Sequence, residues 1–126
     1  MAVEYSGLDQ SYSLDSTSAG YSYSAGTVLD SGTVTPANAN LLVFGGGTTD
    51  ATGMAFLGVG TGFTCIAANV KSIAEELITT SPNNTLRRAN ATANTSVNWV
   101  MQMAVFRDAS TPRYFIFRKE ESFNIP

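Results

Sequence analysis

The chain has 126 residues, of which 44% are hydrophobic and only 13% charged, and its seven basic and ten acidic side chains give a net charge of −3. The net negative charge argues against a strongly basic nucleic-acid binder. The single cysteine excludes an internal disulfide framework and a cysteine-rich metal site, and the absence of histidine removes the commonest general base and metal ligand. The length fits one domain with its own core, and no segment approaches the roughly 20 apolar residues of a membrane span.

The first third of the chain predicts short strands separated by polar loops. Residues 2–5 can form a short strand, whereas the Ser/Tyr/Asp-rich stretch 8–26 lacks a sustained apolar period, so we expect loop with brief extended pieces there. Residues 27–29 and 32–34 flank a turn signal at residues 30–32, which predicts two short strands joined by a turn.

Three apolar runs in the middle of the chain predict strands punctuated by glycine. Residues 41–44 suit a central strand buried on both faces, and residues 54–57 and 63–67 repeat the pattern. The glycines at 45–47 indicate a turn or bulge, because neither the Lys-Ser/Thr pair nor the helix of a phosphate loop follows them. Cys65 is expected to be a small buried hydrophobe. Strands at this spacing predict an all-β sandwich or barrel.

Residues 70–79 leave helix and strand open. The apolar residues of this segment recur with the spacing of an amphipathic helix, which would turn Glu75 and Glu76 toward solvent. Against a helix, the segment lacks a C-cap glycine and lies between predicted strands. Residues 81–98 are polar and predict a turn followed by an irregular edge strand or loop.

The most apolar segment of the chain is residues 99–107. Both of its faces are apolar, with Trp99 and Met101 on one and Val100 and Phe106 on the other. We therefore expect a central strand that is covered on each side.

No motif in the sequence predicts catalysis, a metal site or a cofactor. The members of the pairs Glu75-Glu76 and Glu120-Glu121 would point to opposite faces of a strand and cannot share a substrate. We therefore expect no enzymatic activity and no cofactor. A calcium site would need folding to bring together acids from separate loops, namely Asp9, Asp15, Asp30 and Asp50.

The C-terminal extension, residues 109–126, is too aromatic to be left in water. Either it folds back and completes its own sandwich, or it crosses to a neighbouring subunit or another protein surface and adds a strand there. Residues 109–112 resemble a hinge that leads away from the body and favour the second alternative. The candidate partner-binding residues are Arg113, Tyr114, Phe115, Ile116, Phe117, Arg118, Phe123 and Ile125.

The chain resembles a family of small β-sandwich domains from tailed-phage structural proteins. The resemblance covers about residues 3–108 and rests on five spaced elements, residues 5–10, 40–44, 60–63, 73–76 and 99–107. It implies a single antiparallel β-sandwich of jelly-roll or lectin-like type in residues 1–108, with the first and last strands pairing in its centre and an extended C-terminal arm. It also implies that residues 73–79 are a strand, which we adopt.

On this resemblance, the expected function is that of a virion structural protein, a capsid decoration (cement) protein that stabilises a bacteriophage head. The implied partners are the major capsid protein or another virion protein and further copies of the chain, as a trimer by analogy, without nucleic acid or membrane. Residues 1–4 carry no signal-peptide features, so we expect synthesis in the host cytoplasm and a place on the outer surface of the virion. The alternative is a carbohydrate- or receptor-binding module of a phage tail or fibre, with Tyr12, Tyr21 and Tyr23 as stacking surfaces for sugars.

Overall fold

The computed structural model describes residues 2–80, 85–109 and 118–122, without the side chains of residues 23–24 and 118–122. Strands make up most of this part of the chain and no helix occurs in it, so the prediction of an all-β protein is confirmed. In chain order the strands are β1 (Ala2–Ser6), β2 (Leu14–Val34), β3 (Leu41–Thr49), β4 (Phe56–Val59), β5 (Thr64–Ala68), β6 (Ser72–Thr79), β7 (Arg87–Arg107) and β8 (Arg118–Ser122).

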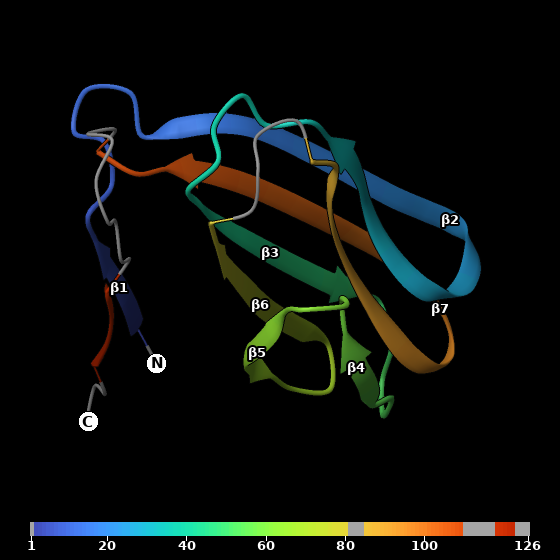
Figure 1. The fold of residues 1–126 in the computed structure, drawn as a ribbon. Helices are drawn as coiled ribbons and strands as arrows, with labels where there is room; N and C mark the ends of the chain where they lie inside the picture. Colours follow the sequence, from blue (N-terminus) through green and yellow to red (C-terminus); the bar gives the residue numbers. More distant parts are fainter. Residues whose placement is uncertain (1, 81–84, 110–117, 123–126) are drawn as a thin grey trace.

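Two strands of 21 residues, β2 and β7, form the frame of the fold. They pair antiparallel over most of their length, and β7 also pairs with β3 and β4. The resulting six-stranded sheet has the order β2-β7-β3-β6-β5, with β4 joined to β7 outside this path (Figure 1). The prediction that residues 99–107 form a central strand is confirmed.

The prediction of an irregular edge strand or loop is wrong for residues 87–97. These residues form the first half of β7 and continue the central strand. Ala89, Ala91 and Ala93 alternate with polar residues and are buried. Alanine gives a weak apolar signal, and for this reason the period of two did not stand out in the sequence.

The paired strands β2 and β7 bend over together, so that two halves of the six-stranded sheet lie face to face. Shifts in the β2–β7 register between Ser22 and Gly26, and between Gly26 and Val28, mark the bend in β2. The expectation of a loop with brief extended pieces over residues 8–26 is wrong from Leu14 onward, where the continuous strand β2 begins.

Beyond the bend, β2 returns along its own first half. The Ser18 hydroxyl donates to the carbonyl oxygen of Gly32 at 3.3 Å, and a Cβ on Gly20 would lie only 1.9 Å from the carbonyl oxygen of Asp30. A stretch rich in serine and glycine suits this approach because larger side chains would hold the two halves apart. Residues 30–32, predicted as a turn between strands, form an irregularity within β2.

Small residues also set the distance between the facing halves at β3. A Cβ on Gly45 would lie 2.7 Å from Cβ of Ala89, and one on Gly47 would lie 2.9 Å from Cδ2 of Leu29; neither of these neighbours is a register partner of the glycine that it faces. The prediction of a turn or bulge at residues 45–47 is wrong, because these glycines continue β3 in register with both β6 and β7. Gly46 points to the other face, where a Cβ would meet nothing closer than 4.0 Å.

The buried apolar core lies between the two halves of the sheet. The inward side chains of β7 are deeply buried, but Val100 on its other face is 42% exposed, so the expectation that both faces are covered is wrong for the outer one. The core residues are Leu29, Leu41, Val43, Met54, Ile73, Ala89, Ala91, Ala93, Val97, Met101, Met103 and Val105.

The segment for which helix and strand competed is strand β6, as adopted from the resemblance. Glu75 and Glu76 point to opposite faces of this strand and both are buried, at 0% and 5% exposure, so neither faces solvent as the helical alternative required. Cys65 was expected to be buried, but it is exposed on β5, the last strand of the sheet order.

Strands β1 and β8 pair antiparallel as a separate two-stranded sheet, called the terminal ribbon below. Figure 1 shows it beside the larger sheet rather than within it. The implied central pairing of the first and last strands of the body is not observed, because β7 pairs with β2 and β3 there. The ribbon is joined to the body where Leu8 forms a single bridge with Asp108 and where the Tyr5 hydroxyl donates to Oε2 of Glu76.

We expect Tyr5→Phe to loosen the terminal ribbon without unfolding the six-stranded sheet. The substitution removes the hydrogen bond to the buried carboxyl of Glu76, with an expected local loss of about 1–2 kcal/mol. Amide hydrogen exchange should accelerate in β1 and remain unchanged in β3 and β7. Equal acceleration in all three strands, or none in β1, would contradict the assigned contact.

Candidate functional site

The face of β2, β7 and β3 that points away from the core is called the outer face. A hollow of about 650 Å³ lies over its middle. Its floor is low because Ala19, Gly46 and Ala104 are small, whereas Phe44 and Gln102 stand beside them. The strand register aligns these residues in two rows, Ala19-Gln102-Gly46 and Thr17-Ala104-Phe44.

A second hollow, of about 280 Å³, lies at one end of the outer face and is called the end hollow below. Tyr21 and Val100 are partners in the β2–β7 register and line it with exposed side chains, at 65% and 42%. Thr48, Asp50 and Asn98 also line the end hollow, whose exposed surface is almost entirely apolar. An exposed aromatic side chain thus stands near a carboxylate and an amide.

Asp50 and Asn98 hold one another in a fixed geometry. The backbone N–H of Asn98 donates to Oδ1 of Asp50 at 3.1 Å, and Nδ2 of Asn98 donates to Oδ2 at 2.7 Å. The backbone N–H of Asp50 donates in return to the carbonyl oxygen of Asn98 at 3.2 Å. A carboxylate offers about four acceptor positions, so these two bonds to Asp50 leave capacity for a ligand.

Tyr12 lies in a different environment from Tyr21. It is 71% exposed, yet its ring packs on the Arg107 guanidinium, whose carbon lies 5.5 Å from the ring centroid. Arg107 Nε lies 3.6 Å from Oδ2 of Asp9, and Asp9 Oδ1 accepts the backbone N–H groups of Ser11 and Tyr12 at 2.8 and 2.9 Å. The bond from Tyr12, then that from Ser11, lowers the pKa of Asp9, and Arg107 acts in the same direction. The loop before β2 is therefore held in place by Asp9.

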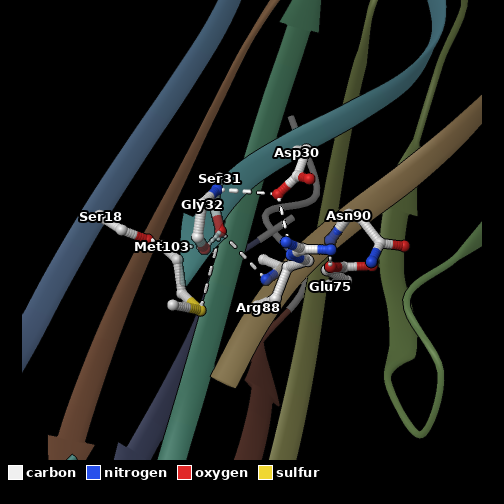
Figure 2. Close-up of polar contacts among 9 residues, drawn as sticks. Ser18, Asp30, Ser31, Gly32, Glu75, Arg88, Asn90 and Met103 are labelled. Carbon is white, nitrogen blue, oxygen red and sulfur yellow. Dashed lines mark hydrogen bonds and ion pairs between the residues drawn. The ribbon is translucent and has the colours of Figure 1, made fainter. Parts of the chain in front are cut away.

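Glu75 connects the two facing halves through a buried carboxylate. Its Oε2 accepts the backbone N–H of Gly60 at 2.9 Å, and its Oε1 accepts the backbone N–H of Asn90 at 3.0 Å. Figure 2 shows the bond to Asn90. Burial raises the pKa of Glu75, and the two backbone hydrogen bonds oppose this effect. The role of Glu75 is structural: it ties β6 to β7 and to the turn after β4.

A second polar cluster fixes the irregular stretch of β2. The hydroxyl of Ser31, which is fully buried, accepts the backbone N–H of Ala89 at 3.1 Å and donates to the Gly32 carbonyl at 2.8 Å (Figure 2). Oδ1 of Asp30 accepts the Gly32 N–H at 2.8 Å and lies 3.3 Å from Nε of Arg88. These bonds explain why a sequence typical of a turn stays in the sheet.

The four acids considered for calcium do not come together. Asp15 accepts Nδ2 of Asn38 at 2.6 Å, while Asp9, Asp30 and Asp50 are held by the separate partners given above. Across residues 2–80, 85–109 and 118–122, no group of three potential metal ligands occurs.

The partner-binding residues predicted in the C-terminal extension lie outside the described residues, with one exception. Arg118 begins β8 and is the register partner of Ser6. The others are Arg113, Tyr114, Phe115, Ile116, Phe117, Phe123 and Ile125. The side chain of Tyr23 is likewise outside the description, whereas Tyr12 and Tyr21 are both exposed, as a stacking role requires.

These features define an all-β protein with a folded-over antiparallel sheet, a terminal ribbon and an exposed outer face. Comparison of the chain with protein-family models, with curated proteins and with solved structures finds no match. In the described part of the chain, no helix is long and apolar enough to cross a membrane.

Proposed function

We propose that this protein is an assembly component: a virion structural protein that decorates and stabilises the head of a tailed phage by binding the major capsid protein. The observation that carries the assembly role is the terminal ribbon, in which β1 and β8 pair with each other apart from the six-stranded sheet. The resemblance of residues 3–108 to phage structural domains directs the proposal to a capsid.

A two-stranded antiparallel ribbon is marginally stable by itself in water. Each of its strands has a second edge whose backbone N–H and C=O groups can pair with another chain. Adding a strand from a partner supplies affinity through main-chain hydrogen bonds and would extend the two described strands of the ribbon to three. The terminal ribbon therefore suits docking onto a capsid subunit or onto a neighbouring copy within a trimer.

The outer face supplies a second contact surface. Its central hollow is lined by uncharged residues, among them Phe44, Gln102 and Ala104. Such a surface loses little solvation when it is buried at a joint between subunits, and burial there raises the free energy needed to separate them. In this proposal the facing halves of the sheet belong to the jelly-roll or lectin-like sandwich type.

The proposal predicts that the purified protein binds phage heads that lack decoration. Binding should saturate and should raise the temperature at which the heads disassemble, because a ligand of the assembled state stabilises it by mass action. A chain that ends at Asp108 lacks β8 and should bind at least about tenfold more weakly, a loss of about 1.4 kcal/mol. Circular dichroism of the shortened chain provides the control for folding. Absent binding, or undiminished binding by a folded shortened chain, contradicts the proposal.

A further inference from the structure

Strand β5 forms an edge of the six-stranded sheet, and no strand in the described part of the chain pairs with its outward side. β5 pairs with β6, whereas the neighbouring β4 pairs with β7. The N–H of Asn69 donates to the carbonyl oxygen of Ser72 at 2.9 Å, and Ala67 is the register partner of Ala74. Backbone groups alternate in direction along an antiparallel strand, so the N–H and C=O of Ala68 point away from β6. They are placed to pair with a strand from another molecule.

Apolar hollows and side chains surround this edge. A hollow of about 240 Å³ lies between β4 and β5, with Leu57 and Ala68 in its lining, and another of about 180 Å³ lies beside Ala67. Leu57 and Val70 are 69% and 54% exposed. An added strand gains affinity from main-chain hydrogen bonds and specificity from hollows that take its alternate side chains. The β5 edge offers both.

Charge favours a second copy of this chain as the partner. Residues 51–70, which include β4 and β5, contain no Asp, Glu, Lys or Arg and no proline. Charged residues and proline are common means of keeping exposed edge strands apart, and of the usual devices this edge has a bulge, between Cys65 and Ala67. Two copies of a chain with a net charge of −3 repel one another least where the surfaces in contact are uncharged. A charged partner, by contrast, would find no opposite charge in this segment.

We propose that β5 pairs antiparallel with β5 of a second copy across a twofold axis, which joins two six-stranded sheets and buries the apolar surface around Leu57. A twofold contact uses up the edge in both copies, so the assembly closes at two. The edge strand has five residues, and an interface of this size is small, so we expect a dissociation constant of about 0.1 mM. Such a contact becomes effective when copies are held side by side, for example on a common surface. It does not depend on what the terminal ribbon binds, because the ribbon is a separate sheet.

The test is a dilution series of the isotopically labelled full chain from about 1 mM to about 10 µM, which spans the expected dissociation constant, followed by sedimentation velocity and backbone amide NMR. The chain should change from mostly dimer to mostly monomer. The amide signals of residues 64–68 should shift with concentration, and hydrogen exchange of the Ala68 N–H should be slower in the dimer.

Two variants place the contact, and a third is the matched control. Leu57→Lys brings two like charges to the joint, and Ala68→Pro removes the outward N–H without removing a β5–β6 hydrogen bond, so each should weaken association about tenfold or more. Leu14→Lys makes the same change at a leucine that is 52% exposed on β2, at the other end of the sheet order, and should associate as the unaltered chain does.

The amide shifts of residues 64–68 decide the outcome. A monomer at 1 mM with unshifted amides overturns the proposed contact, and association without shifts at these residues assigns it to another surface, such as the terminal ribbon. Shifts that persist in a folded Leu57→Lys or Ala68→Pro chain, or that disappear in Leu14→Lys, also reject it. Dispersion of the amide spectrum shows whether each variant is folded, and Leu57→Lys decides alone if Ala68→Pro is not. Each of these failures leaves the binding of phage heads through the ribbon unaffected.

Discussion

Glu75→Leu is expected to lower the free energy of unfolding by about 4 kcal/mol. Leucine fills a similar volume but accepts no hydrogen bond, so the buried N–H of Gly60 and the partly buried N–H of Asn90 lose their acceptor. Each buried donor left without a partner costs about 1–3 kcal/mol. For a domain with a stability of about 5–15 kcal/mol, this loss is a large fraction of the total.

Urea unfolding followed by circular dichroism measures this loss, and Glu75→Gln provides the graded comparison. Glutamine keeps one acceptor oxygen but presents an NH₂ group to the other backbone donor, so its stability should lie between those of the unaltered chain and Glu75→Leu. Equal stability of all three proteins would mean that the carboxylate does not connect the two halves of the sheet.

The same carboxyl group makes the stability of the folded chain depend on pH, and the direction of that dependence follows from its raised pKa. Burial raises the pKa of Glu75 in the folded chain above its usual value of 4.5, so the folded state binds a proton more readily than the unfolded state. The stabilising contribution is fully present below about pH 4.5 and is lost as the pH rises through the folded pKa. The stability of the unaltered chain minus that of Glu75→Gln should therefore fall with rising pH over this range.

Taking this difference cancels the contribution of other acids. Asp9 has a lowered pKa and acts in the opposite direction, because the stability it contributes is lost as the pH falls. Asp9 is present in both proteins and does not alter their difference. A difference that is flat or rises with pH would show that desolvation does not dominate at Glu75.

The strands that the sequence predicted are those with a strong local signal. Residues 41–44 and 99–107 have apolar side chains dense enough to identify buried strands, and both lie in the centre of the sheet. The apolar pattern did not reveal the strand where its residues are small, as they are at the alanines of residues 89–93 and the glycines of residues 45–47. A small residue satisfies packing only when the opposite surface is close, and no local pattern reports that distance.

The candidate site was only partly accessible to sequence reasoning. Tyr21 was singled out as a tyrosine in a polar stretch, and the structure exposes it. Its neighbours Asp50 and Asn98 are 48 positions apart and meet because the end of β3 pairs with the middle of β7. Likewise, Glu75 reaches Gly60 and Asn90 only across the folded sheet. These contacts form only because the bend in β2 and β7 brings two halves of the sheet together, and no local sequence pattern predicted that bend.

The glycines of β3 allow the facing arrangement itself to be tested. Gly45→Ala is expected to lower the free energy of unfolding by about 1–3 kcal/mol, because its new Cβ would lie 2.7 Å from Cβ of Ala89, an atom that cannot rotate away. Gly47→Ala should cost less, because the new methyl group meets the flexible ends of Met101 and Leu29. Gly46→Ala, on the outer face, should be neutral or stabilising by about 0.5–1 kcal/mol, since alanine in a strand loses less entropy than glycine.

The three variants each add one methyl group and lie within three consecutive residues, so strand propensity is matched and the variants differ in the atoms that the new methyl group meets. Urea unfolding should rank them with Gly46→Ala most stable and Gly45→Ala least. The decisive comparison adds Ala89→Gly, which removes the methyl group that the Gly45→Ala side chain would strike. The double variant should lose less stability than the sum of the two single losses, with a coupling of about 0.5–3 kcal/mol, because the two positions exchange one methyl group across the same gap. Additive losses would show that β3 and the first half of β7 do not touch at this point, and the facing of the two halves of the sheet would have to be abandoned.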